Sequence, residues 1–527
     1  MRITNKIIQN NTLSNINATK VAEDTLSSEM SSGKKYVRPS DDPVTAIRAL
    51  RLQSSVSQIT QYNDNNIPDA SSWLDTTSDA LSQESDVVTS IISQYTKGVN
   101  QYMTSSDREI ILEQLKQLKS EVYSTGNADY AGRYVFTGYR TEEPLTFTQD
   151  TTSAYQITEQ LSASDLSTGT HVCTTFTNGG TTEDLKNLTS GTESSYTNVT
   201  EQDISNNTYY RIRLAYKNCD TSYTPSISYT TSAGTTTTIN ATATALSTDV
   251  PSPYDSVGDN AVTYLSDTGE LLLGKNVYTT LSGLTDNSST SSINEGEIRV
   301  TYQKSSFSNG DPRPENYFYC KTAGADGTFS AATGSDDIVY NASYLTGTTS
   351  KQAISYDVGF DQTLQVNTTA DEAFDTGIGR EVDDMTNAMQ SLTSIEGVVS
   401  SLTTMVSAAT DSTTKASLQT QLDAANKALS YQQSNVKNMF SSGITTMQGY
   451  LDQVNVAATD CGSRGSRLEL IQTRMTAQKS TFKTLQSDNE DVDLSETAVQ
   501  LQSAELAYEA SLQATAKIMK TNLMQYI

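Results

Sequence analysis

The segment of this sequence that comes nearest to a chemical motif is Gly269–Asn276, which reads GELLLGKN. A phosphate-binding loop has two glycines separated by four residues, then Lys and then Ser or Thr, whose hydroxyl reaches magnesium. Here Asn276 takes the place of that hydroxyl residue, and three consecutive leucines are typical of a buried strand. No helix signal follows the segment. We therefore predict a strand and turn here, and not a nucleotide site.

Imidazole and thiol chemistry has few candidate residues. The chain has one histidine, His171, and four cysteines, Cys173, Cys219, Cys320 and Cys461, none of them in a Cys-x-x-Cys pair. Histidine-based zinc sites, catalytic triads and the HExxH helix all need imidazole beside other specific residues. We expect His171 in a loop or on the surface, the cysteines to be free, and Cys461 to be a small buried apolar residue.

Acidic residues dominate the charge of the chain. There are 61 Asp plus Glu against 35 Lys plus Arg, a formal net charge of -26, which disfavours broad attraction to nucleic acid or to anionic lipid. Neighbouring carboxylates such as Asp336–Asp337 and Asp383–Asp384 are expected by chance in so acidic a chain. The sequence therefore predicts no catalytic residue, no metal site and no cofactor, and the protein is not expected to be an enzyme.

A chain of 527 residues is long enough for about three or four domains. Its residue composition and apolar pattern divide it into three parts. Residues 1–139 and 371–527 look helical, and the part between them is rich in Thr, Ser, Gly and Tyr. No apolar run approaches the ~20 residues of a membrane span, and the first thirty residues lack the apolar core of a secretory signal. We expect a protein that is either cytosolic or exported by another route.

The two helical parts carry apolar residues at heptad spacing. Asp42 before Pro43 predicts a helix start, because Asp caps free amides and Pro is tolerated at the first helical position. Ser106 and Glu109 have capping-box spacing and predict a second start. Apolar residues then recur every seven positions, which keeps one stripe facing a partner helix. The predicted bundle core contains Leu74, Leu81, Val88, Met447, Val454, Leu468, Met475 and Phe482.

The extreme ends carry further apolar stripes. The acidic segment 487–491 is predicted to be a hinge, after which Asp493 and Glu496 restart a helix in capping-box fashion. Neither end offers enough apolar surface to be stable alone, so we expect both to become ordered by packing against neighbouring subunits. The predicted assembly interface contains Ile3, Ile7, Leu13, Ile16, Leu501, Tyr508, Leu512, Met519 and Leu523.

The middle part has the two-residue period of β-strands. Apolar and polar residues alternate over 210–216 and 298–302, and Asp326–Gly327 is a hairpin-turn signal. Antiparallel β-structure is expected, either as one large domain or as two smaller ones. The lone Trp73, beside the heptad stripe of the first helical part, is expected to serve packing.

Both ends of the chain resemble the bacterial flagellin family. Three early segments, Met1–Thr4 (MRIT), Met30–Lys35 (MSSGKK) and Pro39–Pro43 (PSDDP), resemble its N-terminal region. Gly132–Tyr139 (GRYVFTGY) resembles the hairpin signature of its hook-associated protein 3 branch, the hook-filament junction proteins. Three late segments resemble the C-terminal end of that branch: Glu490–Leu494 (EDVDL), Ala514–Met519 (ATAKIM) and Asn522–Ile527 (NLMQYI). The long middle part matches no family pattern.

The pattern and the resemblance together predict an α+β multidomain fold. Discontinuous N- and C-terminal helical domains would form antiparallel coiled coils, and a β-rich outer region would be inserted between them. The predicted domains are a terminal inner domain from 1–40 and 488–527, a helical bundle with a short hairpin from 41–145 and 372–487, and an outer region over 146–371, in one or two domains.

The resemblance implies a structural subunit of the flagellum, an adaptor at the hook-filament junction that self-assembles through its terminal helices. Its implied partners are copies of itself, the first hook-associated protein on the hook side, flagellin on the filament side and a flagellar export chaperone, with no nucleic acid or membrane. The protein would be extracellular, exported without a cleaved signal peptide through the flagellar export apparatus. Two alternatives remain: a flagellin filament subunit, and an adhesin whose outer region binds glycans.

Overall fold

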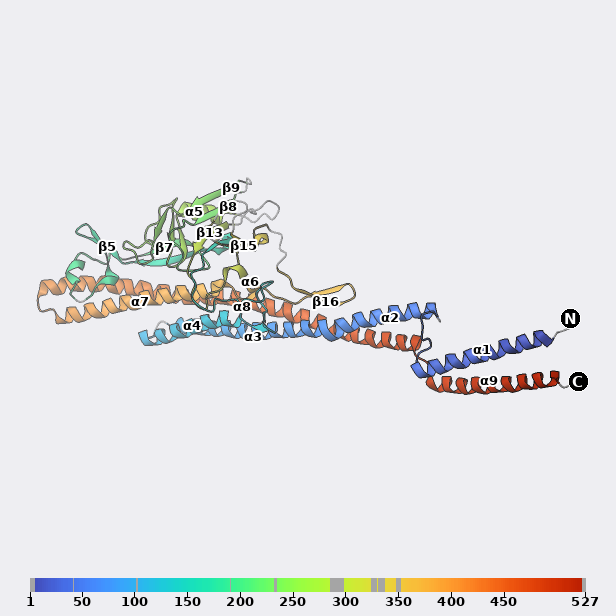
Figure 1. Cartoon of the computed structure of the whole chain (residues 1–527). Coiled ribbons are helices and arrows are strands. Elements are labelled where there is room, and N and C mark those ends of the chain that lie inside the picture. The colour runs from blue at the N-terminus through green and yellow to red at the C-terminus, as the bar shows by residue number, and fades with distance from the viewer. Residues whose placement is uncertain are drawn as a thin grey trace. The chain divides into compact units, whose positions relative to one another are not determined.

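The computed structural model describes residues 5–40, 42–100, 103–189, 191–231, 235–284, 298–323, 329, 337–346 and 352–523. The chain forms two compact units. The first contains Met1–Ser71, Tyr356–Leu364 and Ser466–Ile527, and the second contains Ser72–Ser355 and Gln365–Gly465. Helices at both ends of the chain and strands in its middle confirm the predicted α+β fold (Figure 1). The three-domain division stays a prediction.

Four helices supply most of the first unit. They are α1 (Asn5–Ser32), α2 (Pro43–Gln61), the C-terminal part of α8 (Ser412–Glu490) and α9 (Leu494–Leu523). The predicted start at Asp42 is confirmed, because its Oδ1 accepts hydrogen bonds from the amides of Val44 and Thr45, both at 3.1 Å. The π-helical turn Tyr62–Asn66 follows α2 and leads into α3 (Ile67–Gly98).

The predicted hinge over 487–491 is largely wrong. Helix α8 continues to Glu490, and the break between α8 and α9 is confined to residues 491–493. Asp493 then caps α9, since its Oδ1 accepts from the amides of Ser495 at 2.9 Å and Glu496 at 3.2 Å. The cap explains why the new helix begins where it does: it satisfies two amides that have no partner inside the helix.

The helical layer of the second unit contains parts of α3 and α8 together with α4 (Ser105–Thr125) and α7 (Thr376–Ala408). Helix α4 begins slightly before the predicted start at Ser106. Thr104 and Asp107 form its capping box, with the Asp107 amide donating to Thr104 Oγ1 at 3.2 Å and the Thr104 amide donating to the Asp107 carboxylate at 3.1 Å. The observed box lies two residues before the predicted Ser106–Glu109 box.

Glycines in these helices allow aromatic rings to pack against the backbone. A Cβ atom at Gly443 would lie 2.2 Å from the Tyr95 ring, and one at Gly98 would lie 2.3 Å from the Phe440 ring. The two rings themselves meet edge to face, with centroids 5.6 Å apart. Each glycine costs about 1 kcal/mol of helix propensity relative to alanine, and burial of two aromatic side chains offsets that cost.

Two larger sheets form the β-rich part of the second unit. One has strand order β10 (Ala243–Ala245), β11 (Val262–Leu265), β12 (Glu270–Leu273), β7 (Ser205–Arg213) and β4 (Leu166–Cys173). The other has strand order β15 (Ile338–Tyr340), β14 (Tyr319–Thr322), β3 (Tyr155–Leu161), β13 (Ile298–Lys304), β8 (Ser226–Thr230) and β9 (Thr236–Asn240). Neighbouring strands are antiparallel except β10 and β11, which are parallel.

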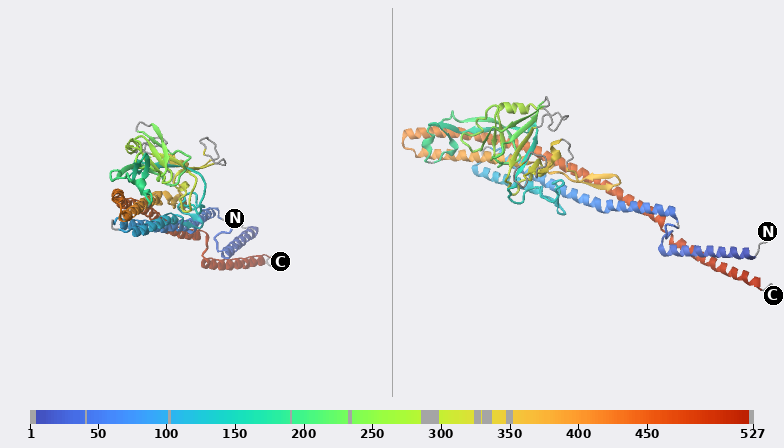
Figure 2. Two further views of the ribbon diagram at one scale, coloured as in Figure 1. Left: turned by 90° about the vertical axis from the view of Figure 1, so that its left-hand side faces the viewer. Right: turned by 45° about the horizontal axis from the view of Figure 1, so that its top comes forward.

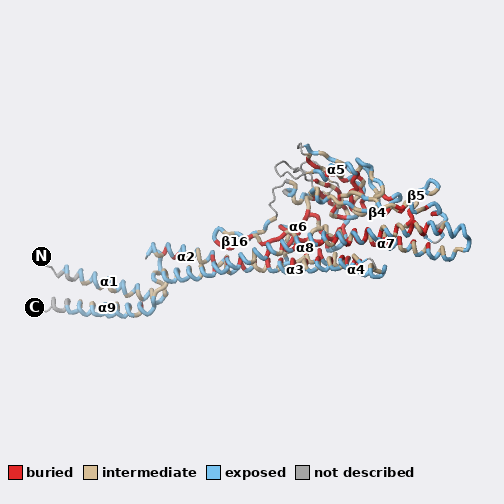
Figure 3. The backbone as a smooth tube through the Cα atoms, turned by 180° about the vertical axis from the view of Figure 1, so that it is seen from behind, coloured by how far each residue is buried: buried red, intermediate tan, exposed pale blue. Residues whose placement is uncertain are grey.

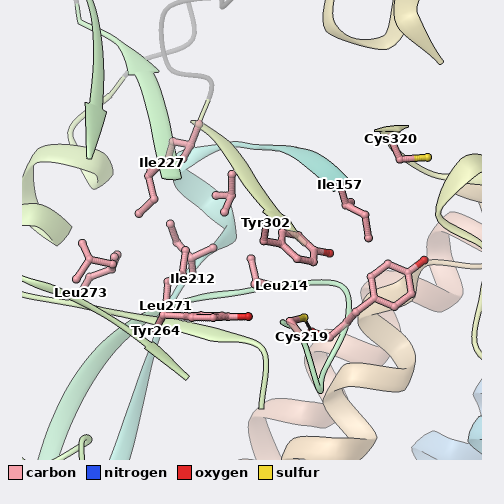
Figure 4. Close-up of a cluster of buried hydrophobic side chains, with 14 of the residues drawn as sticks. Ile157, Ile212, Leu214, Cys219, Ile227, Tyr264, Leu271, Leu273, Tyr302 and Cys320 are labelled. Carbon is pink, nitrogen blue, oxygen red and sulfur yellow. Dashed lines mark hydrogen bonds between the residues drawn. The ribbon is translucent and has the colours of Figure 1, made fainter. Parts of the chain in front are cut away.

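One hydrophobic core joins the two sheets. Ile212 and Leu271 from the first sheet and Ile157 and Tyr302 from the second belong to the same buried cluster, and Figure 4 shows their side chains converging. The two sheets therefore form one sandwich, and the division of residues 146–371 into one domain or two stays a prediction. The alternating strands predicted over 210–216 and 298–302 correspond to β7, which ends at Arg213, and to β13, whereas Asp326–Gly327 lies outside the described residues.

Short elements complete the fold. They are hairpins β1–β2 (Asp129–Tyr130, Arg133–Tyr134), β5–β6 (Thr175–Asn178, Thr181–Asp184) and β16–β17 (Ser355–Gly359, Gln362–Gln365), helices α5 (Lys275–Ser282) and α6 (Ala370–Ala373), and 3-10 turns at 163–165, 185–187, 193–196, 314–316 and 342–346. Positive φ angles at Ala131 (53°) and Gly132 (77°) make the two-residue turn of β1–β2. Arg133 of this hairpin lies over the buried ring of Trp73, 5.0 Å from its centroid, which gives Trp73 its packing role.

A carboxylate is buried in α3 without a partner. Glu84 is 0% exposed, and among the described residues no donor reaches either of its carboxylate oxygens. Burial, and secondarily repulsion from Glu121, raises the pKa of Glu84 to about 9. The native protein therefore keeps this proton to higher pH than the unfolded chain does, so folding stability falls as pH rises from about 4.5 towards 9.

Replacing this carboxylic acid by an amide should remove that pH dependence. We expect Glu84→Gln to become progressively more stable than the wild type, by about 1 kcal/mol per pH unit between pH 6 and 8. Urea unfolding at several pH values measures the difference. Glu109→Gln, at an exposed position of α4, is the matched control and should follow the wild type at every pH. A constant offset between Glu84→Gln and the wild type would contradict the prediction.

Candidate assembly interface

Helices α1 and α9 pack side by side in the first unit, with both chain ends at the same end of the pair (Figures 1 and 2). The half-buried positions of each helix recur every three or four residues, which places them on one face. In α1 these positions are Thr12, Ile16, Thr19, Glu23, Leu26 and Glu29. In α9 they are Ala498, Leu501, Ala504, Tyr508, Ser511 and Thr515. The pair is thus held by one narrow, partly polar seam.

The remaining surface of the pair is open, as the mostly pale blue tube of α1 and α9 in Figure 3 shows. Of the residues predicted to face neighbouring subunits, Ile16, Leu501 and Tyr508 are half-buried on the seam inside the chain. The others whose side chains are described, Ile7, Leu13 and Leu512, are exposed. Ile3 lies outside the described residues, and Met519 and Leu523 lie in α9 with side chains outside the described part.

Large apolar side chains that the sequence reading missed cover the outer side of the pair. Val21 of α1 is 65% exposed, and Val499 and Leu506 of α9 are 68% and 67% exposed. Val499 and Leu506 are seven residues apart, so they share a face. Nine residues, about two and a half helical turns, separate Val499 from Tyr508, which puts the two on opposite sides of α9. Helix α9 therefore has a second apolar stripe that nothing within the described chain covers.

The linker that follows α1 and the linker that precedes α9 lie at the same end of the pair and are joined to each other. Lys34 Nζ donates to Glu490 at 2.9 Å and to Asp491 at 2.7 Å, and the backbone amide of Lys35 donates to the Glu490 carbonyl at 2.7 Å. The hydrogen bonds to Asp491 and Glu490 raise the pKa of Lys34. Gly33, with φ +69°, makes the turn that follows α1. The contact brings together two of the segments, MSSGKK and EDVDL, on which the family resemblance rests.

The predicted bundle-core residues are mostly buried. Leu74, Leu81, Val88, Met447, Val454, Leu468 and Met475 are at most 3% exposed. Leu468 and Met475 belong to the first unit and the others to the second. Phe482, the last residue of the heptad series in α8, is only half-buried, so the buried part of the series ends before it.

A buried ion-pair cluster attaches the β-sandwich to α7. Arg211 and Arg213 of β7 reach Asp384 of α7 at 2.6 and 2.9 Å, and Arg213 also reaches Glu381 at 2.8 Å. Glu270 of β12 pairs with Arg211 from the neighbouring strand. Burial alone would raise the pKa of Asp384, but Arg211, Arg213 and Arg380 lower it to about 2. Asp384 is therefore ionised across the ordinary pH range.

The sequence reading had treated Asp383–Asp384 as a chance pair of neighbouring carboxylates. In the structure both carboxylates have cationic partners, Lys119 at 2.7 Å and Lys217 at 3.0 Å for Asp383, and the β7 arginines for Asp384. The alternation in Tyr-Arg-Ile-Arg, 210–213, is the signal that could have placed both arginines on the outer face of the sheet, opposite Ile212. Their partners, some 170 residues away, carry no matching signal.

The histidine, the cysteines and the segment Gly269–Asn276 occupy positions in the fold that explain them without a chemical role. His171 is in strand β4 and not in a loop; its Nδ1 lies 2.9 Å from Asp255, and its ring stacks on Tyr254. The four cysteine thiols are free, and Cys461 is buried. Helix α5 does follow Gly274, contrary to expectation. The turn nevertheless offers no phosphate cradle, because a Cβ at Gly274 would lie 2.1 Å from the Gly258 carbonyl oxygen.

The described residues contain neither a metal-ligand cluster nor a membrane-spanning helix. Among these residues, no group of three or more His, Cys, Asp or Glu side chains is placed to hold a metal ion. None of the described helices combines the length and the apolar character that a membrane-spanning helix needs.

Two family models match the terminal parts of the chain. Residues 3–141 match the bacterial flagellin N-terminal helical region, and residues 444–527 match the bacterial flagellin C-terminal helical region. The matched segments contain α1, α9 and both linkers that Lys34 joins. The β-sandwich lies outside both matches.

Curated relatives point to the same family. Flagellar hook-associated protein 3 of Salmonella typhimurium is 27% identical over 143 residues, 27% of this chain and 45% of that protein. The Escherichia coli protein of the same name is 30% identical over 115 residues, 22% of this chain and 36% of that protein. The chain thus spans less than half the length of these curated relatives.

Among solved structures, FlgL of Xanthomonas campestris is similar over 84% of this chain and 99% of its own, with 11% identity and a TM-score of 0.24. That score is too low to support an argument about fold or function. The two terminal matches do not depend on it: residues 3–141 and 444–527 are similar to the N- and C-terminal helical regions of bacterial flagellins.

Proposed function

We propose that this protein is a structural subunit of the bacterial flagellum, an adaptor at the hook-filament junction that assembles through α1 and α9. The observation that carries the proposal is the uncovered apolar stripe of α9, Val499 and Leu506, in a region that matches the flagellin family. The names of the relatives, hook-associated protein 3, supply the position at the junction.

The α1–α9 pair has little hydrophobic stabilisation of its own. Its seam includes Thr19, Glu23 and Ser511, which add little hydrophobic stabilisation. Covering exposed Leu and Val side chains with helices of a neighbouring subunit would contribute about 1.5–3 kcal/mol for each fully buried side chain. Stacked subunits would therefore stabilise the pair, and the pair would in turn form the contact between subunits.

The proposal includes partners and location. The subunit would contact copies of itself, the first hook-associated protein on the hook side and flagellin on the filament side, and an export chaperone would bind it before assembly. It would reach the outside through the flagellar export apparatus without a cleaved signal peptide. Its role would be mechanical and not enzymatic.

Locating the protein on intact cells tests this function. Labelled antibody against the β-sandwich should mark one narrow band at the distal end of the hook. A signal along the whole filament would identify a filament subunit instead, and a complete absence of flagellar labelling would refute the assignment.

The isolated protein should be weakly ordered at α1 and α9. We expect amide hydrogens of both helices to exchange faster than those near Val88 and Met447 in the helical core, because the seam buries little surface. Hydrogen-deuterium exchange on the purified, dilute full chain measures this. Protection of α1 and α9 equal to that of the core would mean that the pair needs no neighbour.

A further inference from the structure

A small cavity with several charged side chains in its wall lies in the second unit, where helices α4 and α7 meet the segments that follow β7 and β13. Its volume is about 50 Å³. Six charged residues line it: Lys119, Lys217, Lys304, Arg380, Asp311 and Asp383. The tyrosines Tyr123 and Tyr216 also belong to its wall, and their hydroxyl groups already bond to backbone groups.

The lining is positively charged although the chain carries a net charge of -26. Four cationic and two acidic residues leave a formal excess of two positive charges. Three of the cations share one carboxylate: Lys119, Lys217 and Arg380 approach Asp383 at 2.7, 3.0 and 3.7 Å. These three cations share Asp383, so the lining residues keep a formal excess of positive charge.

Lys304 is a buried lysine whose ammonium group bonds to backbone carbonyl groups. This residue is 3% exposed, and its Nζ donates to the backbone carbonyls of Lys217 at 2.7 Å and Asn218 at 3.1 Å. Among the described residues, none forms an ion pair with it. Burial lowers the pKa of Lys304, and burial together with its cationic neighbours lowers the pKa of Lys119. Its Nζ also lies 5.1 Å from the centroid of the Phe307 ring, and Asp311 and Asp220 act on it at longer range. A buried ammonium group without an ion-pair partner is costly and gains from a negative charge placed beside it.

We propose that this cavity binds a small oxyanion of the phosphate or sulfate class. One ordered water needs about 10–15 Å³, so the volume suits a single tetrahedral anion and not a nucleotide. Lysine and arginine provide the charge-assisted donors that such oxygens accept. The bound anion would contact α4, α7 and both loops, so it would strengthen the attachment of the β-sandwich to the helices.

Thermal unfolding of the full chain under titration tests the site. At constant ionic strength, inorganic phosphate or sulfate should raise the Tm along a saturating curve, while chloride should not, because binding to the native state alone stabilises it. Glycerol 3-phosphate is a third arm: a response to it as strong as the response to phosphate would mean that the source includes phosphomonoesters. An equal, non-saturating response to phosphate and chloride would overturn the proposal.

Two substitutions locate the binding. Lys217→Gln should weaken the binding of phosphate about tenfold. The Lys217 side chain is 47% exposed, so we expect this variant to fold. Lys304→Met should abolish the phosphate-dependent shift. Lys275→Gln removes an equal charge at an exposed position of α5 and should leave the titration unchanged. Unchanged phosphate affinity in both cavity variants, or an equal loss in the control, would show that the anion binds elsewhere.

Discussion

Val499→Asp is expected to abolish incorporation of the protein into the flagellum while leaving the isolated chain folded. Val499 is 68% exposed on the side of α9 that faces away from α1, so a carboxylate there remains in water in the free protein. Substitutions at such positions usually change stability by no more than about 0.5 kcal/mol. Between packed subunits the same carboxylate would be buried without a partner, at a cost of several kcal/mol.

The measurement combines two readouts on cells that lack the wild-type gene. Motility and attached filaments should be lost with Val499→Asp, whereas thermal unfolding of the purified variant should match the wild type. Leu506→Asp, one heptad further along the stripe, should behave in the same way.

Val456→Asp is the matched control. Val456 lies in α8, is 69% exposed and undergoes the identical change, so it tests whether an added surface charge alone disturbs export or assembly. Cells carrying this variant should swim normally. Normal filaments on Val499→Asp cells would refute the assignment of the α9 stripe to subunit contacts.

Local signals predicted much of the fold because their physical causes are local. Asp42 and Asp493 each cap a helix with their own carboxylates, and the alternation around Ile212 and Val300 reflects strands with one buried face. The errors concern helix ends. The capping box of α4 lies two residues before the predicted one, and the acidic segment 487–491 looked like a break although it continues α8 to Glu490.

The candidate interface could be predicted only in part. An apolar stripe shows that a helix face needs cover, but not whether the cover comes from the same chain. The sequence reading chose the stripe containing Leu501 and Tyr508, which α1 covers, and passed over Val499 and Leu506, which remain exposed. The ion pairs between β7 and α7 were missed for a related reason: Arg211 and Asp384 are 173 residues apart, and no local pattern joins them.

The second large effect is expected from Asp384→Ala, which should destabilise the second unit by about 3–5 kcal/mol. The change removes the carboxylate that Arg211 and Arg213 share and leaves two largely buried guanidinium groups with one carboxylate each, Glu270 and Glu381. Breaking a buried ion pair by removing one partner has a cost of this size, because the remaining charge stays desolvated. Asp452→Ala, at an exposed position of α8, is the control and should lie near the wild type.

The pH dependence of this loss separates the ion pair from simple packing. The pKa of Asp384 is lowered to about 2, below its ordinary value of 3.8, so its stabilising effect is complete above about pH 4 and is lost as pH falls through 2. Urea unfolding of the wild type and Asp384→Ala should therefore differ most at neutral pH and converge towards pH 2. A difference that stays the same down to pH 2 would mean that Asp384 acts through its volume, and a difference below 1 kcal/mol at pH 7 would mean that the arginines find other acceptors.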